Sequence, residues 1–245
     1  RRWNYLLRKH VMITLRDYQQ KAIQAFQNAP TMSLGILPTA SGKTIILTTL
    51  AKNLESVIIA PSIELVNQLK QHYPDVYTYH TAYNRKITGK HLLIDEAHRC
   101  KSNGMVGTII ERFETVYGLT ATPHRLDIGD IYPGLFKHKV FEITKEELSQ
   151  HNYLTPRRYV DISVDKLINV KASKLNNITE LSEDVCPQTK KCVDDFILQW
   201  NGKPTVVFGC DIKHCVKIAD VFEIIGNVRC QIISGDTPKT LRAKY

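Results

Sequence analysis

Apolar positions in the first half of the chain alternate between two kinds of spacing. From residue 16 to 27 they recur at the spacing of an amphipathic helix, and Asn28, Ala29 and Pro30 then end the pattern. The same spacing predicts helices over residues 45–54 and 63–72. Short, mostly apolar segments typical of buried strands occupy residues 32–37, 56–60, 91–94 and 116–121. This alternation predicts an α/β fold whose parallel sheet is buried on both faces.

The second half of the chain has a weaker version of this pattern. Residues from about 136 to 156 lead out of the first domain, and the polar residues 166–187 predict a linker or irregular segment. A second α/β pattern then predicts helices over 193–200 and 212–222, strands over 205–208 and 229–233, and a turn at 234–236. We therefore expect a first domain over residues 1–155, a linker over 156–190, and an incomplete second domain over 191–245.

The composition is that of an ordinary soluble protein. Hydrophobic residues make up 43% and charged residues 23% of 245 positions, enough for one large domain or two smaller ones. The net charge of +9 suits a polyanionic partner, and it equally suits plain solubility. The cysteines lack the Cys-x-x-Cys spacing of a zinc site. Because no segment approaches the roughly 18 apolar residues of a membrane span, and no secretion signal is recognisable, the sequence predicts a cytoplasmic protein without a membrane partner.

A Gly-Lys-Thr triplet at residues 42–44 lies between a predicted strand and a predicted helix. This is the context of a phosphate-binding loop, in which backbone N–H groups surround the phosphates, Lys43 meets the β- and γ-phosphates and Thr44 binds magnesium. The full eight-residue motif is not met, because its first position is Leu37. A surface loop is the alternative interpretation. The predicted nucleotide-binding residues of this loop are Thr39, Ala40, Ser41, Gly42, Lys43 and Thr44.

Two adjacent carboxylates, Asp95 and Glu96, end another predicted strand. Asp95 is predicted to hold magnesium and Glu96 to orient the attacking water, because phosphoryl transfer needs positioning and charge neutralisation above all. A solvated acidic strand end is the alternative, although two such carboxylates repel each other without a cation. His98 is either a switch between the nucleotide and a neighbouring segment or a residue that begins a helix. The predicted catalytic residues are Lys43, Asp95, Glu96 and His98.

Five ordered motifs together resemble lobe 1 of the superfamily-2 helicases. They are LRDYQ (15–19), PTASGKT (38–44), APS (60–62), DEAH (95–98) and TATPHR (120–125). The segments TVVF (205–208) and SGDTPKTLR (234–242) resemble the start of lobe 2 of the same enzymes. The resemblance implies two RecA-like parallel-sheet lobes, the second incomplete, with Mg²⁺ and ATP bound between them.

The spelling of two motifs narrows the resemblance to one branch. TATPHR and LRDYQ are similar to the DNA-directed branch of restriction-enzyme motors, repair helicases and phage branch-migration helicases, whereas DEAH-box RNA helicases usually have Ser-Ala-Thr in the third motif. The resemblance implies that Arg16 and Gln19 contact adenine and that Thr120 and Thr122 couple hydrolysis to lobe closure. It also implies that Pro61, Ser62 and Arg125 serve nucleic-acid contact or coupling. A tight turn after a strand is the alternative for these positions.

This sequence departs from the family pattern in three places, which changes what we expect of ATP binding and hydrolysis. Leu37 and Ala40 replace glycines of the phosphate loop, and the second change is mild provided that φ of Ala40 is negative. The span between the APS and DEAH motifs is short for this family. The later lobe-2 motifs, including the arginines that reach the γ-phosphate, have no match before Tyr245. Because such an arginine is worth several orders of magnitude in rate, we expect this sequence to bind ATP and to hydrolyse it weakly.

The sequence thus predicts an ATP-dependent DNA helicase or translocase, with single-stranded or forked DNA as partner. Four alternatives stay open: the motor part of a restriction complex, an RNA-directed helicase, a P-loop ATPase or kinase that acts on a small molecule, and a non-catalytic binding module.

Overall fold

The chain forms two compact units, residues Arg1–Arg157 and Arg158–Tyr245. The structure is a computed structural model that describes residues 14–100, 104–124, 131–156, 192–193, 196–197, 202 and 204–242. Among the described helices, none is long and apolar enough to cross a lipid bilayer.

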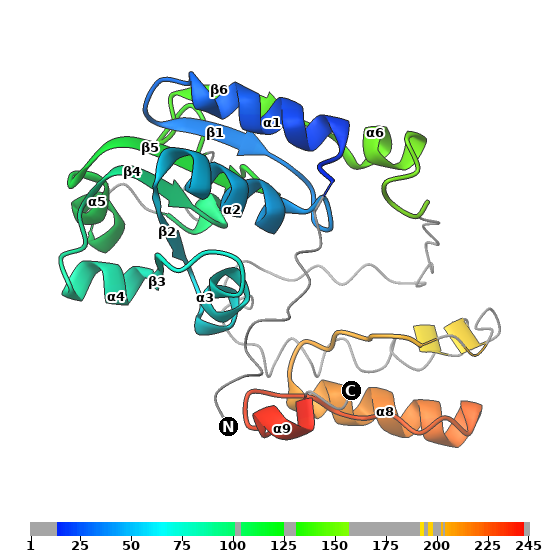
Figure 1. Ribbon diagram of the computed structural model, residues 1–245. Helices are drawn as coiled ribbons and strands as arrows, with labels where there is room; N and C mark the ends of the chain where they lie inside the picture. The colour runs from blue at the N-terminus through cyan, green and yellow to red at the C-terminus, as the bar shows by residue number, and fades with distance from the viewer. Residues whose placement is uncertain are drawn as a thin grey trace, which may run out of the picture. The chain divides into compact units, whose positions relative to one another are not determined.

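The first unit is built on one six-stranded sheet with the strand order β3-β2-β4-β5-β1-β6 (Figure 1). Every neighbouring pair in it is parallel. The strands are β1 (Ser33–Ile36), β2 (Val57–Ala60), β3 (Val76–Thr78), β4 (Gly89–Ile94), β5 (Phe113–Thr120) and β6 (His138–Glu142). The predicted α/β fold with a parallel sheet is confirmed for this unit.

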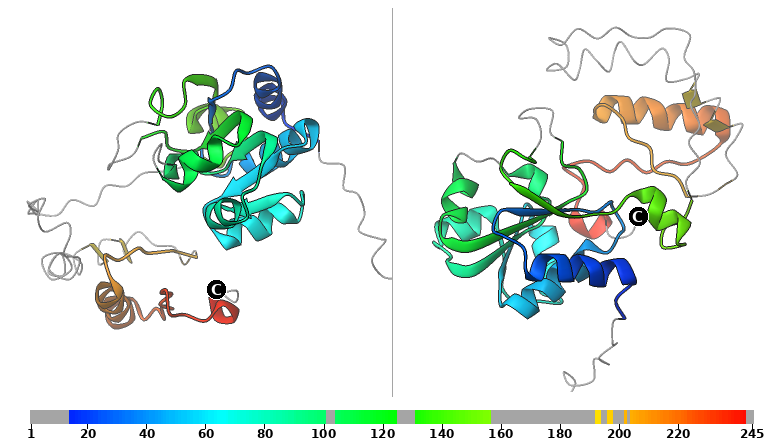
Figure 2. Two further views of the ribbon diagram at one scale, coloured as in Figure 1. Left: turned by 90° about the vertical axis from the view of Figure 1, so that its left-hand side faces the viewer. Right: turned by 90° about the horizontal axis from the view of Figure 1, so that it is seen from above.

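Helices cover both faces of this sheet (Figure 2). On one face lie α1 (Asp17–Gln27), α2 (Lys43–Leu54) and α3 (Ile63–Lys70). On the other face lie α4 (Tyr79–Asn84) and α5 (Met105–Ile110). A short 3₁₀ helix, η1 (Ala97–Arg99), follows β4, and α6 (Lys145–Gln150) follows β6. The helices predicted over 16–27, 45–54 and 63–72 are confirmed to within two residues at every end.

Alternate residues of the central strands pack into the two separate cores. On β4, Leu93 contacts the α1–α3 side, whereas Leu92 and Ile94 contact the α4–α5 side. This follows from the two-residue period of a strand. Each fully buried aliphatic side chain contributes about 1.5–3 kcal/mol to folding. Because both faces of the central strands are apolar, polar functional groups belong at the strand ends.

The carboxyl ends of the strands lie along one edge of the sheet. Ile36 at the end of β1 pairs with Thr120 at the end of β5, and Ile94 at the end of β4 pairs with Gly118. Ile94 also pairs with Ile59 of β2. The loops that follow these four strands therefore meet at the same edge, which is where open α/β sheets bind ligands.

Among the described residues of the first unit, two strands and three α-helices were not predicted from the sequence. β3 has only three residues, and α4 and α5 have six residues each, so their apolar period is too short to recognise. β6 is an edge strand with mostly exposed side chains, and it lies with α6 in the segment that we interpreted as the exit from the domain. Edge strands lack the continuous apolar run of a buried parallel strand.

The second unit contains the helices α8 (Ile212–Gly226) and α9 (Lys239–Arg242). The helix predicted over 212–222 is confirmed and extends further, and Asp211 caps it by accepting a hydrogen bond from the backbone N–H of His214 at 2.7 Å. Ile218 and Phe222 of α8 form a small core with Val193. Most of the helix predicted over 193–200 and all of the linker predicted over 166–187 lie outside the described residues.

Two predicted strands of the second unit are not strands in this structure. Among the described residues, neither 205–208 nor 229–233 is paired into a sheet. A strand is defined by hydrogen bonds to a neighbouring strand, and apolar residues alone do not supply one. Without this pairing, Val206 is 78% and Phe208 is 91% exposed.

Candidate nucleotide-binding site

The loop between β1 and α2 has the backbone shape of an anion-binding site. Ala40 and Gly42 have φ values of 66° and 77°, and Gly42 is the N-cap of α2. The left-handed Ala40 and Gly42 turn the chain into α2, where the N–H groups of the first helical turn and the positive end of the helix dipole favour an anion. The N–H of Ser41 donates within the loop, to the carbonyl of Pro38 at 3.3 Å. The condition under which the replacement of glycine by Ala40 would be mild, a negative φ, is not met, so the alanine is held in a strained conformation.

Helix α1 fixes the orientation of this loop through the carbonyl of Ser41. The hydroxyl of Tyr18 donates to this oxygen at 2.6 Å, and Nε2 of Gln19 donates to it at 3.3 Å. In a trans peptide the C=O and the following N–H point in opposite directions. Because the Ser41 carbonyl points to α1, the N–H of Gly42 points away from α1. A Cβ at Gly42 would lie 2.5 Å from Nε2 of Gln19, so the position requires glycine.

Gln19 lies beneath the loop and is only 3% exposed. Its Oε1 accepts from the backbone N–H of Arg16 at 3.0 Å, while its Nε2 bonds to Ser41. The structure therefore gives Gln19 a supporting position under the phosphate loop, and a contact with adenine stays a prediction.

Arg16 is exposed and contacts an aromatic residue from the end of the unit. Its guanidinium lies 5.0 Å from the ring centroid of Tyr153, and its Nη1 donates to the Tyr153 carbonyl at 3.4 Å. The Tyr153 ring is in turn 5.3 Å from that of Tyr18. No sequence pattern signalled Tyr153, because it follows α6 and lies far from every motif.

Lys43 and Thr44 begin α2 and face the loop from its helical side. Nζ of Lys43 donates to the carbonyl oxygens of Leu37 and Pro38 at 3.3 and 3.4 Å, which places the ammonium beside the loop. The buried hydroxyl of Ser41 has no hydrogen-bond partner within the described residues. The donor-rich loop, the lysine and the Thr44 hydroxyl fit a phosphate group with a bound cation.

The chain turns sharply at Asp95 and Glu96, directly after β4. Glu96 has a φ of 50°, which is left-handed for a residue with a side chain, and its N–H donates to Oδ1 of Asp95 at 3.0 Å. Asp95 is 7% exposed. Burial and the charge of Glu96 raise the pKa of Asp95 to about 6, and the Glu96 N–H and the charge of Lys43 oppose this. A divalent cation would favour the ionised form of such a carboxylate.

Tyr79, the first residue of α4, contacts the same turn. Its hydroxyl donates to the backbone carbonyl of Asp95 at 2.9 Å, and the thiol of Cys100 lies 3.8 Å from the Tyr79 oxygen. Burial is the main cause of the raised pKa of Tyr79, so the phenol keeps its proton and remains a donor. Sequence reasoning missed this residue, because α4 was not predicted and nothing local connects residue 79 with residue 95.

His98 in η1 connects the acidic turn with the end of β5. Its Nδ1 lies 3.0 Å from Oγ1 of Thr120 and 3.3 Å from Oε2 of Glu96. Since a carboxylate oxygen only accepts, we assign a proton to this nitrogen. Thr120 also bonds to both the carbonyl and the N–H of Thr122. His98 lies within the short helix η1 and also contacts the end of β5, and its role as a switch between the nucleotide and this segment stays a prediction.

Pro61 and Ser62 lie at the carboxyl end of β2, next to the acidic turn. Oγ of Ser62 accepts from the N–H of Leu65 at 3.3 Å and caps α3. This is the structural role of a turn residue after a strand, and contact with nucleic acid stays a prediction. Arg125 lies outside the described residues.

Comparison with known proteins finds one matching family and similar solved structures. Residues 12–92 match the family described as the type III restriction enzyme res subunit. No curated protein matches the chain. Among solved structures, the UvsW helicase from bacteriophage T4 is 20% identical over 54% of this chain and 61% of that chain, with a TM-score of 0.44. A nuclease-deletion mutant of the type ISP restriction-modification enzyme LlaGI, in complex with a DNA substrate mimic, is 13% identical over 74% of this chain and 23% of that chain, with a TM-score of 0.46. The chain therefore spans less than two thirds of either protein.

Proposed function

We propose that this superfamily-2 helicase-like protein hydrolyses ATP and couples the hydrolysis to movement on DNA. The main support is that segments far apart in the sequence meet at one edge of the sheet. The phosphate loop follows β1 and the acidic turn follows β4, and only β5 separates these strands. Neighbouring strands are about 4.8 Å apart, so the two segments lie roughly 10 Å from each other, the scale of a triphosphate with its cation.

In this proposal each group of the site has a separate task. The N–H groups of the loop and the ammonium of Lys43 bind the phosphates, and Thr44 and Asp95 hold Mg²⁺. When bound, Mg²⁺ neutralises charge on the phosphate oxygens. The carboxylate of Glu96 accepts a hydrogen bond from the attacking water and orients it toward the γ-phosphate. Tyr18 and Gln19 keep the loop in its anion-binding conformation, and the exposed Arg16 with Tyr153 lies at the base end of the nucleotide.

Coupling to movement rests on the contact between the acidic turn and β5. His98 touches both Glu96 and Thr120, so a change at the phosphates reaches Thr120 through two contacts and Thr122 through a third. In the related enzymes that the motifs resemble, this segment couples hydrolysis to closure of the two lobes.

The proposed polymer contact involves the ends of β2 and β3, beside the acidic turn. Pro61 and Ser62 there present backbone and short polar groups, which bind phosphates regardless of base sequence. The net charge of +9 is compatible with a polyanion as partner. The DNA-directed branch is preferred over the RNA-directed one because of the TATPHR and LRDYQ motifs.

The proposal is tested by measuring ATP hydrolysis alone and with single-stranded DNA, duplex DNA, forked DNA and RNA. We expect stimulation by DNA and loss of hydrolysis in Lys43→Ala and Glu96→Gln. Matched controls are Lys52→Ala, on the exposed side of the same helix, and Glu114→Gln, an exposed carboxylate on β5. We expect both controls to keep the wild-type rate.

Three outcomes would contradict the proposal in different ways. Unchanged turnover in Lys43→Ala or Glu96→Gln would overturn the site assignment. A rate of ATP hydrolysis that no added nucleic acid changes would favour an ATPase that acts on a small molecule. Stronger stimulation of ATP hydrolysis by RNA than by any DNA would favour an RNA-directed helicase.

One observation favours a second candidate, the motor part of a restriction complex. The matched family is that of restriction-enzyme res subunits. Such a motor would track along duplex DNA without separating the strands. Displacement of a third strand from a triplex, without unwinding of a forked duplex, would support this candidate, and unwinding of the fork would support a helicase.

A further inference from the structure

We propose that Tyr79 is a positioning residue for Asp95, and that it links the β3–α4 segment to the metal-binding end of β4. This inference rests on the proposed function, because it concerns the magnesium ligand of the same site. Tyr79 belongs to none of the motifs by which the site was predicted.

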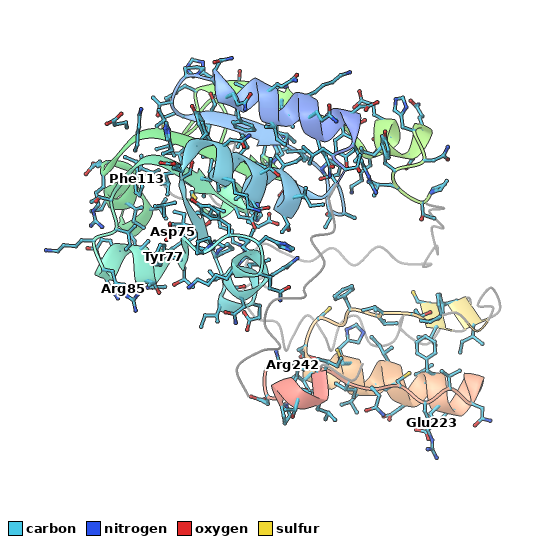
Figure 3. The ribbon with its side chains drawn as sticks, in the orientation of Figure 1. Asp75, Tyr77, Arg85, Phe113, Glu223 and Arg242 are labelled. Atoms are coloured by element: carbon cyan, nitrogen blue, oxygen red, sulfur yellow. The ribbon has the colours of Figure 1, made fainter. Side chains whose placement is uncertain are left out.

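The position of Tyr79 is set by the segment that precedes it. Thr78 ends β3 and caps α4, with its Oγ1 accepting from the N–H of Thr81 at 3.1 Å. Tyr79 is the first residue of α4, and Ala82 of the same helix packs in the core with Ile94. Asp75, Tyr77 and Arg85 mark the course of this segment in Figure 3. The ring is thus held by a capped helix that is anchored in the core.

The hydroxyl of Tyr79 acts on the peptide that orients the Asp95 carboxylate. The carbonyl of Asp95 and the N–H of Glu96 belong to one planar peptide group. The carbonyl accepts from Tyr79 at 2.9 Å, and the N–H donates to Oδ1 of Asp95 at 3.0 Å. Because the peptide is rigid, fixing its carbonyl also fixes the N–H that holds the carboxylate.

The need for such support comes from the backbone of the turn. Glu96 has a φ of 50°, a conformation that residues with a side chain adopt at a cost, so surrounding contacts must maintain it. The Tyr79 hydroxyl is one such contact. Outer partners of this kind, which hold a metal ligand in place without touching the metal, change metal affinity roughly 10-fold or more when they are removed.

The same contact connects the turn with the surface proposed to bind nucleic acid. Tyr77 and Thr78 of β3 pair with Ile59 and Ala60 of β2, immediately before Pro61. A displacement of the ends of these two strands moves the first residue of α4 and therefore the donor to Asp95. Tyr79 provides a direct physical link from this surface to the magnesium ligand.

The test compares Tyr79→Phe with a matched variant, Tyr73→Phe. Each change removes one phenol hydroxyl that donates to a backbone carbonyl, at 2.9 Å to Asp95 and at 2.7 Å to Ser56 respectively. Ser56 precedes β2, at the amino edge of the sheet, so Tyr73 is remote from the acidic turn. The readout is binding of a fluorescent ATP analogue at increasing Mg²⁺ concentrations, together with the melting temperature.

We expect similar small decreases in melting temperature for both variants. Only Tyr79→Phe should raise the Mg²⁺ concentration for half-maximal analogue binding, by roughly 10-fold. It should also reduce the stimulation of hydrolysis by DNA more than the basal rate. A half-maximal Mg²⁺ concentration within about twofold of wild type in Tyr79→Phe, or an equal shift in Tyr73→Phe, would overturn the role of Tyr79.

The failure of the proposed function would look different. In that case the wild-type protein itself would show no Mg²⁺-dependent binding of the analogue, and the inference about Tyr79 would fall with it. Should Tyr79→Phe not fold, Cys100→Ala removes the thiol beside the Tyr79 oxygen and keeps the phenol. Because a donor to the phenol oxygen strengthens the phenol as a donor in turn, this variant should shift the Mg²⁺ dependence in the same direction by less than Tyr79→Phe, and a shift in the opposite direction would overturn the proposal.

Discussion

The imidazole Nδ1 of His98 lies 3.0 Å from the hydroxyl of Thr120, although 22 positions separate the two residues in the sequence. The contact crosses from the loop after β4 to the end of the neighbouring strand β5. It joins the acidic turn to the threonine that also holds Thr122. One hydrogen bond thus connects two motifs that the sequence presents separately.

This contact should be measurable as a coupling energy in the folded protein. We expect a double-mutant cycle of His98→Ala and Thr120→Val to give about 1 kcal/mol of interaction in urea unfolding. His91 on β4 and Thr115 on β5 offer a matched control, because Nδ1 and Oγ1 are 2.6 Å apart there. The control pair should show similar coupling without loss of ATP hydrolysis. Additive effects of His98→Ala and Thr120→Val would contradict the contact.

Gly42→Ala should damage the phosphate loop through both strain and collision. A left-handed alanine costs about 1–2 kcal/mol, and the new Cβ would force Gln19 off the Ser41 carbonyl. We expect lower stability and loss of nucleotide binding. Gly104→Ala, also at positive φ but with open space around the Cβ, should lower stability only. Nucleotide binding by Gly42→Ala at the wild-type affinity would show that the loop does not bind phosphate.

Ala40→Gly should stabilise the protein. Ala40 has a φ of 66°, so glycine removes strain and costs only its greater flexibility in the unfolded chain. The net gain in the free energy of unfolding should be about 1 kcal/mol, measured by urea denaturation. Ala25→Gly, inside helix α1, should lose about 1 kcal/mol in the same measurement. A loss of stability in Ala40→Gly would mean that the loop is not left-handed at residue 40.

Asp95→Asn should change how stability depends on pH in the absence of Mg²⁺. The pKa of Asp95 rises from 3.8 to about 6 on folding, so the folded protein favours the protonated form. Relative to the always neutral asparagine, wild type is equally stable below pH 4 and loses stability as pH rises through 6. The difference corresponds to about 3 kcal/mol at pH 8. Urea unfolding of both proteins from pH 4 to 8, with a chelator present, measures it, and parallel curves would contradict the raised pKa.

Much of the first unit could be predicted from local patterns. The apolar period places α1, α2 and α3, and the buried-strand pattern places β1, β2, β4 and β5 with their polar ends. The elements that were missed are short or lie at an edge, where too few residues repeat for a period to emerge. Segments 205–208 and 229–233 resemble strands in composition, but neither is paired with a strand among the described residues.

The sequence by itself determined the class of fold and the position of the phosphate loop and acidic turn at strand ends, because both depend on residues that are close along the chain. Only the tertiary structure decided that Tyr18 and Gln19 hold the loop, that Tyr79 holds Asp95, and that Ala40 is left-handed. These contacts depend on the order and register of the strands, which bring residues together from distant segments. A local pattern contains no information about such neighbours. The supporting residues of the site can therefore be identified only from the tertiary structure.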